Sequence, residues 1–360
     1  MHLRHAAPCL LVLAALACTP DAEDTGGATA TDAEGTGGAT ATDTTTAATT
    51  AASTTAATDA TTTADTAPET TGAEPPAEEL IVASFLGDDV RVFDPATGAH
   101  LATWTPEGLD GALGLAIGPD GHVLVASEES GAVLRLDGQS GALLGALVRD
   151  DPGTPDDESG GLQGPGALLV GAMGDLLVSS FDSDAILRYD LATGAFLDVL
   201  VPEGAGGLDG PDAGMVFGPG GDLFVPSYYG DAVLRYDGVT GDPVGAFTPA
   251  DGSLDGPRTL LFDGDLLLVT SERTGEVVRF RADTGDYVDV LVAGVPEPAG
   301  MVLSAGGDLL VVSLALGTVE AFDPATGEHR GTRVGPDGGL QGPTHAILRP
   351  AVLTRATPRP

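Results

Sequence analysis

The sequence predicts an all-β fold, a six-bladed β-propeller that follows a disordered stalk. One segment recurs six times from Leu80 onward, at spacings of 43, 53, 47, 44 and 42 residues. Each repeat holds four short apolar segments separated by turn residues, and helical periodicity is absent. Four short strands in a repeat of this length are typical of a propeller blade, so six copies predict six blades.

Each copy contains the second and third strands of a blade, joined by a short loop. The third strand ends in a turn such as DPATG, which occurs at 94–98 and again at 323–327. In such turns Asp and Thr cap backbone N–H groups and Gly supplies a positive φ, so a tight hairpin to the fourth strand is expected. The six copies span 80–94, 123–137, 176–190, 223–237, 267–281 and 309–323.

The two ends of the repeat array predict how the ring closes. The copy at 80–94 lacks a preceding strand, whereas the last copy is followed by GLQGPTHAILRP, which matches the segments that precede the other copies. We therefore expect 344–348 to pair beside 80–84, which leaves no open sheet edge at the seam. The propeller is predicted to occupy 80–350, followed by a tail at 351–360.

The start of the chain, 1–17, has the features of a signal peptide. A short basic beginning precedes the apolar run CLLVLAALA, which is too short to span a bilayer. The residues before Cys18 resemble the lipobox of bacterial lipoproteins, and this resemblance implies that Cys18 becomes the lipidated N-terminus. Thr19, in place of Asp, then implies the outer membrane of a Gram-negative cell envelope. The alternative is an ordinary signal peptide with a free or removed Cys.

Residues 18–79 are predicted to be a disordered linker. They consist almost entirely of Thr, Ala, Gly, Asp and Glu, so they offer nothing from which a core could be built. A flexible chain of this length spans about 40–50 Å root-mean-square. We expect it to act as a stalk that holds the propeller clear of a membrane.

The charge and the cysteines exclude several classes of protein. The chain has 360 residues and a formal charge of −38, from 53 acidic and 15 basic side chains. So acidic a surface repels nucleic acids and anionic membranes, and any membrane contact is expected only through the anchor. Both cysteines lie within the first 18 residues, so the predicted propeller has no disulfide and no thiolate metal site. A monomer is expected.

The unit VLVASEESGAVLRLD, with the turn GPDG before it, resembles the NHL-repeat type of propeller. That group includes gluconolactonase-like and streptogramin-lyase-like proteins, and the likeness covers 80–350. It implies that the loops before the first strand and between the second and third strands of each blade form the binding face. Gluconolactonase-like enzymes hold a metal with Glu, Asn and Asp, but 80–350 contains no Asn. Streptogramin-lyase-like enzymes use a His with a nearby Glu and a metal, and only His345 could match.

Residues common to all six copies are expected to serve the scaffold, and residues that break the pattern are better candidates for function. A serine ends the second strand of every copy, which predicts structural hydrogen bonding. The six are Ser84, Ser127, Ser180, Ser227, Ser271 and Ser313. His345 replaces small residues at the channel mouth, where it is a candidate general base or ligand, or fills space at the seam. The binding-face candidates are His345, Tyr228, Tyr229, Phe181, Glu128, Arg258 and Arg273.

A divalent cation such as Ca²⁺ is a second possible ligand of this face. The loops before the first strands place six residues at related positions: Asp110, Gln163, Asp209, Asp255, Glu297 and Gln341. Carboxylates around a channel mouth suit a hard cation, and Asp110, Asp209 and Asp255 are the candidate ligands. The alternative is that these aspartates only cap turns. No other cofactor is predicted.

The sequence therefore favours a binding module for an extracellular protein or glycan. The alternative is a metal-dependent hydrolase, lactonase-like, or a lyase acting at the channel mouth. The acidic insertion at 150–161 is expected to project over the binding face as a lid or docking loop, or to be a solvated loop without a role. Neither the catalytic residues nor the partner follows from the sequence.

Overall fold

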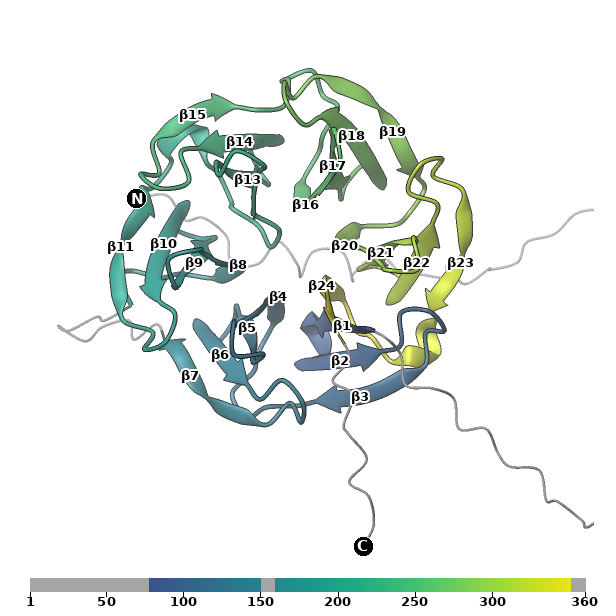
Figure 1. The fold of residues 1–360 in the computed structure, drawn as a ribbon, viewed down its shortest axis with the longest axis horizontal. Coiled ribbons are helices and arrows are strands. Elements are labelled where there is room, and N and C mark those ends of the chain that lie inside the picture. The colour runs from purple at the N-terminus through teal and green to yellow at the C-terminus, as the bar shows by residue number, and fades with distance from the viewer. Residues whose placement is uncertain (1–77, 150–158, 351–360) are drawn as a thin grey trace, which may run out of the picture. The chain divides into compact units, whose positions relative to one another are not determined.

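The computed structural model describes residues 78–149 and 159–350. The chain divides into two units, 1–69 and 70–360, and every described residue belongs to the second. Its strands form six four-stranded antiparallel sheets, arranged as blades around a central channel (Figure 1). The predicted all-β, six-bladed propeller is confirmed. Within the described ranges, no helix is long and apolar enough to cross a membrane.

Each blade runs from an innermost strand at the channel to an outermost strand at the rim. Blade 1 is β24 (Pro343–Pro350), β1 (Glu78–Ser84), β2 (Asp89–Phe93) and β3 (His100–Trp104). Blade 2 is β4 (Ala112–Ile117), β5 (Val123–Ser127), β6 (Ala132–Leu136) and β7 (Leu143–Arg149). Blade 3 is β8 (Pro165–Val170), β9 (Asp175–Ser180), β10 (Ala185–Asp190) and β11 (Phe196–Val201).

Blade 4 is β12 (Val216–Phe217), β13 (Leu223–Ser227), β14 (Ala232–Tyr236) and β15 (Pro243–Ala246). Blade 5 is β16 (Pro257–Asp263), β17 (Leu266–Ser271), β18 (Glu276–Arg281) and β19 (Tyr287–Ala293). Blade 6 is β20 (Pro298–Leu303), β21 (Leu309–Ser313), β22 (Thr318–Phe322) and β23 (His329–Val334). Three short 3₁₀ turns lie in loops: η2 (Phe85–Gly87), η3 (Ala205–Gly207) and η4 (Pro336–Gly338).

The second strand of each blade is apolar on both faces because a neighbouring blade covers each face. In β1, Leu80 and Ile81 are both fully buried, but they belong to different hydrophobic clusters. Ile81 packs with Leu115 and Val125 of blade 2, whereas Leu80 packs with Leu310 of blade 6. The core is therefore a ring of clusters between blades, which explains why these strands have continuous apolar runs instead of strict alternation.

The ring closes as predicted, through the last strand of the chain. β24 pairs antiparallel with β1, with Ile81 opposite Ile347 and Leu80 opposite Leu348. The pairing extends from Glu78 opposite Pro350 to Ser84 opposite Pro343, so it is longer than the five residues expected. Blade 1 is thus built from both ends of the propeller, and its folding requires that the two ends meet.

The six serines bind the loop that leads into the innermost strand of their own blade, which we call the lead-in loop. Ser127 Oγ donates to the carbonyl of Asp110 at 3.0 Å and accepts the N–H of the same residue at 2.9 Å. Ser84 forms the same pair with Gln341, across the seam of the ring. All six serines are fully buried, so the prediction of structural hydrogen bonding is confirmed.

The DPATG turns lie at the face opposite the lead-in loops and join the third and fourth strands. Asp94 Oδ1 accepts the N–H of Ala96 at 2.8 Å, as its position in the turn requires. Gly98 has a φ of +73°, and a Cβ at this position would lie 1.7 Å from the carbonyl oxygen of Arg333 in blade 6. The turn glycine is therefore needed for its conformation and also for the close approach of the neighbouring blade.

Candidate functional site

The candidate site lies at the mouth of the central channel, on the face formed by the lead-in loops and the loops between second and third strands (the 2–3 loops). In each blade the first residue of the 2–3 loop directly follows the buried serine. A hydrogen bond joins Tyr228 of blade 4 to Glu272 of blade 5, and the ring of Phe181 of blade 3 lies 6.3 Å from that of Tyr228. The six residues are Phe85, Glu128, Phe181, Tyr228, Glu272 and Leu314.

Three predicted aromatic residues gather on the side formed by blades 3 and 4. The rings of Phe181 and Tyr229 are 5.7 Å apart, and those of Tyr228 and Tyr229 are 5.2 Å apart. Phe181 and Tyr228 are buried, but Tyr229 is 45% exposed. The guanidinium of Arg273 lies over both tyrosines, 4.5 Å and 5.9 Å from the ring centroids, and pairs with Asp255 at 2.8 Å. These contacts form a rigid aromatic base beneath an exposed ring and an exposed cation.

An ionic cluster lies beside the aromatic residues and deeper in the mouth. Arg258, in β16, is 3% exposed and pairs with Glu272 at 2.7 Å and with Asp212 at 3.2 Å. Tyr228 Oη donates to Glu272 Oε1 at 2.8 Å. Asp212 lies in the lead-in segment of blade 4 and is also buried. The cluster therefore links blades 4 and 5 and connects the ion pairs to the aromatic base.

Three carboxyl groups of the mouth, those of Glu128, Asp212 and Glu297, have raised pKa values. Burial raises the pKa of Glu128 to about 8, and the negative charge of Asp212 adds to this effect while Arg258 opposes it. Burial also raises the pKa of Asp212 against the opposing effect of Arg258. Glu297 in blade 6 has a raised pKa for the same reason, with a further contribution from Glu272. Perturbed carboxyl groups in one concave region are characteristic of functional sites.

His345 lies in the channel wall with a defined tautomer. Its Nδ1 accepts the backbone N–H of Leu115 at 3.1 Å, so the proton of the neutral ring lies on Nε2. Burial, and then the charge of Arg258, lower the pKa of His345 to about 4. At neutral pH the ring therefore offers an N–H donor. This geometry does not suit the general base or metal ligand that the sequence suggested for His345.

The channel beside His345 contains a cavity of about 350 Å³. Its walls come from the six innermost strands and are mostly apolar, with Leu115, Met215 and Met301 among them. Thr259 also lines it and is 3% exposed. Its hydroxyl has no hydrogen-bond partner among the described residues. The side chains that line the cavity are thus apolar except for those of Thr259 and His345, and backbone polar groups form part of the wall.

The three aspartates suggested as cation ligands are not brought together. The backbone of each is fixed by the serine of its own blade, as for Asp209 with Ser227. Asp255 is paired with Arg273. In the part of the chain that the structure describes, no group of three or more His, Cys, Asp or Glu side chains is placed to hold a metal ion. The described arrangement of Asp110, Asp209 and Asp255 gives no cation site.

The position of Glu297 corrects the sequence alignment of the lead-in loops. The sequence placed Glu297 with the loop aspartates, but Ser313 bonds to the carbonyl of Pro296 instead. Glu297 therefore occupies the next position, which is Gly in the other five blades, and it has a φ of +48°. The five glycines are Gly111, Gly164, Gly210, Gly256 and Gly342, with φ values from 56° to 68°. A side chain in this conformation is strained, and such strain is found most often at functional sites.

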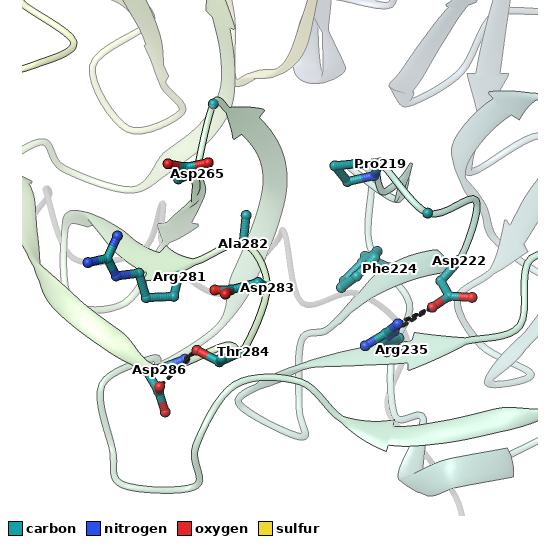
Figure 2. Close-up of a pocket in the computed structure, with 12 residues that line it drawn as sticks. Pro219, Asp222, Phe224, Arg235, Asp265, Arg281, Ala282, Asp283, Thr284 and Asp286 are labelled. Carbon is teal, nitrogen blue, oxygen red and sulfur yellow. Dashed lines mark hydrogen bonds and ion pairs between the residues drawn. The ribbon is translucent and has the colours of Figure 1, made fainter.

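A groove on the face opposite the channel mouth is another candidate for the site. It has a volume of about 820 Å³ and lies between blades 4 and 5, where Figure 2 shows side chains on its two walls. Asp222 pairs with Arg235 on one wall, and Thr284 bonds to Asp286 on the other (Figure 2). None of the predicted site residues lines the groove. The mouth is therefore the better candidate for the site.

Several sequence-based expectations lie outside the described residues. Most of the acidic insertion falls in 150–158, so its role as a lid or docking loop stays a prediction. The signal peptide, Cys18 and the linker up to residue 77 lie outside the described ranges, as does the tail at 351–360. Their assignments also stay predictions. The linker was predicted to extend to 79, but Glu78 and Glu79 belong to β1, so the propeller begins two residues earlier than expected.

No family model and no curated protein matches the chain. A chain in the crystal structure of the nidogen/laminin complex is similar, with a TM-score of 0.60 and 17% identity, over 75% of this chain and 98% of that chain. A Bacteroides caccae protein of unknown function has a TM-score of 0.56 and 13% identity, over 76% of this chain and 98% of that chain. A streptogramin B lyase has a TM-score of 0.47 and 18% identity, over 62% of this chain and 69% of that chain. These likenesses concern the fold. The predicted resemblance to this type of propeller is confirmed at that level.

Proposed function

We propose that the propeller is a binding module that engages an extracytoplasmic protein partner through the channel mouth. The observation that carries this proposal is the exposed pair of Tyr229 and Arg273 on a buried base of Phe181 and Tyr228. Tyr and Arg are the residues that contribute most often to the binding energy of protein interfaces. Here the side chains of Tyr229 and Arg273 are both held in place by neighbouring rings. Binding a partner therefore costs little side-chain conformational entropy.

Two exposed leucines favour a protein over a glycan as the partner. Leu86 is 40% exposed in the 2–3 loop of blade 1, and Leu316 is 51% exposed in that of blade 6. Both lie on the same face as Tyr229. The apolar surface is therefore distributed over several blades, which suits a broad protein interface better than a single sugar ring.

The geometry of His345 favours binding over catalysis. To act as the base or metal ligand of a hydrolase or lyase, the role that the sequence suggested for it, His345 would need a free lone pair on a ring nitrogen that faces the mouth. With Nδ1 accepting from Leu115 and Nε2 carrying the proton, the ring is arranged as a hydrogen-bond donor. Such a donor supports recognition of a partner.

We predict that Tyr229→Ala reduces partner capture at least tenfold, because removing an exposed aromatic anchor costs about 1.4 kcal/mol or more. The matched control is Tyr287→Ala, since Tyr287 is also 45% exposed but lies on the outer strand β19. The protein and both variants are immobilised, exposed to envelope and secreted extracts, and the retained molecules are quantified by mass spectrometry. Equal retention by Tyr229→Ala and Tyr287→Ala contradicts the proposed face, and retention of glycans alone indicates the other partner class.

We further propose that Cys18 is lipidated and anchors the module in the outer membrane. The support is the sequence around Cys18 and the linker composition of 18–79. We expect Cys18→Ser to move the protein from the membrane fraction to the soluble fraction and to abolish incorporation of a radiolabelled fatty acid. A variant that stays in the membrane fraction without label contradicts the anchor.

A further inference from the structure

His345 and Thr259 stand at the same level of the central channel. Each is the third residue of an innermost strand, His345 in β24 of blade 1 and Thr259 in β16 of blade 5. Blade 6 lies between these two blades, as the positions of β16, β20 and β24 in Figure 1 show. Its third residue is Gly300, which puts no side chain between them. The other residues at this level are also small: Gly114, Ala167 and Gly214.

Contacts between neighbouring strands confirm this common level. Gly214 pairs with Thr259 in an isolated parallel bridge. A Cβ on Gly300 would lie 2.9 Å from the Cα of His345, so the two residues lie side by side. The level is therefore a ring of small residues from which only His345 and Thr259 extend polar side chains.

These two polar side chains line one cavity, that of about 350 Å³ in the channel. His345 Nδ1 accepts from Leu115, and the proton-bearing Nε2 forms no hydrogen bond with another described residue. Thr259 is 3% exposed, and its hydroxyl likewise has no partner within the described ranges. A buried hydroxyl without a partner costs stability unless a bound group satisfies it. The cavity thus offers two hydrogen-bond donors at one level.

The rest of the wall suits an uncharged, apolar molecule. The residues that follow this level in the six strands all line the cavity: Leu115, Leu168, Met215, Leu260, Met301 and Ala346. No charged side chain of the described residues is among those that line it, so a charged ligand would lose its hydration without a partner. A mostly apolar cavity with a few polar groups, within the range of about 300–1,000 Å³, is typical of small-molecule sites.

We propose that the channel binds a small uncharged molecule with an apolar body and a carbonyl group, whose oxygen lies at the level of His345 and Thr259. A carbonyl oxygen has two lone pairs and can accept both from an imidazole N–H and from a hydroxyl. Ketones and esters belong to this class. The site is distinct from the proposed protein-binding face, because neither Tyr229 nor Arg273 lines the cavity.

The methionines of the chain provide a direct test of binding in the channel. The full-length protein is labelled with ¹³C at the methionine methyl groups and titrated with acetophenone, a small uncharged ketone. Met215 and Met301 line the cavity, whereas Met173 is 87% exposed and does not. Acetophenone should shift the NMR signals of Met215 and Met301 but not that of Met173, and the shifts give its Kd. Unchanged signals from the two cavity methionines overturn the proposal.

The contribution of the Thr259 hydroxyl is measured with a second probe, α-methylstyrene, in which a CH₂ group replaces the carbonyl oxygen. Thr259→Val keeps the shape of the side chain and removes its hydroxyl. It should weaken acetophenone binding about tenfold and change the Kd of α-methylstyrene less than twofold. A similar effect on both probes contradicts a hydrogen bond to the carbonyl.

Ser253→Ala is the matched control for this variant. The hydroxyl of Ser253 is also buried without a partner among the described residues, but Ser253 does not line the cavity. The variant should change the Kd of either probe less than twofold. If it weakens acetophenone as much as Thr259→Val does, the effect does not arise in the channel and the proposal fails.

Stability supplies a readout that a merely structural threonine would not give. Without a probe, Thr259→Val should raise the melting temperature by about 2–4 °C, because it removes a buried hydroxyl that has no partner. A variant that binds the ketone less well but is more stable is expected only where the hydroxyl serves a ligand. A lower melting temperature would show that the hydroxyl already stabilises the fold, which contradicts its role as a donor to the ligand.

The last arms test the second donor and the charge of the ligand. His345→Phe should also weaken acetophenone about tenfold and leave α-methylstyrene within twofold, and Thr259→Val keeps the test valid if loss of the Leu115 contact unfolds the His345 variant. Benzoate has nearly the same size as acetophenone but carries a charge. Tighter binding of benzoate would indicate an anion site, and binding of α-methylstyrene alone would indicate a purely apolar cavity. Either result overturns the proposal.

Discussion

Replacing Gly98 by Ala is expected to destabilise the propeller by about 3 kcal/mol or more. Two costs add at this position. The left-handed conformation, with a φ of +73°, disfavours any side chain, and the new Cβ would overlap the carbonyl oxygen of Arg333 at 1.7 Å. Because Arg333 lies in blade 6 and Gly98 in blade 1, relief of the overlap requires that blades 1 and 6 move apart. Urea denaturation followed by tryptophan fluorescence measures the loss.

The control for this prediction is Gly108→Ala. Gly108 also has a positive φ, +83°, but nothing lies within 4 Å of the position that its Cβ would take. Only the conformational cost of about 1–2 kcal/mol then remains. The difference between the losses of stability of the two variants measures the free-energy cost of disturbing the contact between blades 1 and 6. Equal losses at Gly98 and Gly108 would show that this contact contributes nothing.

This contact explains why similar turns recur around the ring. Gly327, in the second DPATG turn, approaches the carbonyl oxygen of Leu291 in blade 5 in the same way that Gly98 approaches blade 6. Gly194, Gly241 and Gly285 approach carbonyl oxygens of their preceding blades as well. The turn thus makes the same contact in five blades.

The blade count and the closure could be predicted because they depend on local patterns that repeat. Each blade needs two buried strands, a serine such as Ser127 and a turn glycine such as Gly98, and these recur at fixed offsets. Closure followed from one missing strand at the start and one additional strand at the end. These features depend on the backbone geometry of turns and strands, and the residues that this geometry requires recur at a fixed period in the sequence.

The site was predictable only in part. Residues that break the repeat did lead to the aromatic cluster and to Arg258. The sequence did not single out Asp212, because blade 4 has a longer lead-in segment that shifts the alignment. Glu297 resembles the loop aspartates in charge, but the proline that follows it, Pro298, matches the prolines that follow the glycines of other blades. The sequence also did not reveal the tautomer of His345, which depends on the amide of Leu115, 230 residues away.

These limits have a common physical origin. A propeller brings residues from different blades to one mouth, so partners such as Glu128 and Asp212 are close in space but distant along the chain. The repeat shows where each side chain stands within its own blade. Which charges meet across the channel depends on the order of blades around the ring and on the length of each lead-in segment.

Replacing Arg258 by Met is expected to cost about 3–5 kcal/mol at pH 8, because it leaves two carboxylates without their buried partner. Arg258 is 3% exposed, and its partners Asp212 and Glu272 are buried or partly buried. Met keeps an unbranched apolar stem like that of Arg, so the loss is mainly electrostatic. Equilibrium unfolding in urea at two pH values measures it.

The pH dependence of this loss follows from the raised pKa of Asp212. Arg258 opposes the effect of burial on that pKa, so in Arg258→Met the pKa of the folded state rises further above its unfolded value of 3.8. A carboxyl with a raised folded pKa stabilises the folded state when protonated, and this contribution is lost as the pH rises through the folded pKa. The deficit of the variant relative to the unmodified protein should therefore be smaller at pH 5 than at pH 8.

Arg330→Met is the matched control. Arg330 also pairs with two carboxylates, Asp308 and Asp323, but its side chain is 40% exposed on the outer strand of blade 6. Water replaces its charge when it is removed, so we expect a loss below about 1 kcal/mol. A similar loss for Arg258→Met, or a deficit that does not change between pH 5 and 8, would mean that the mouth is more hydrated than its burial indicates.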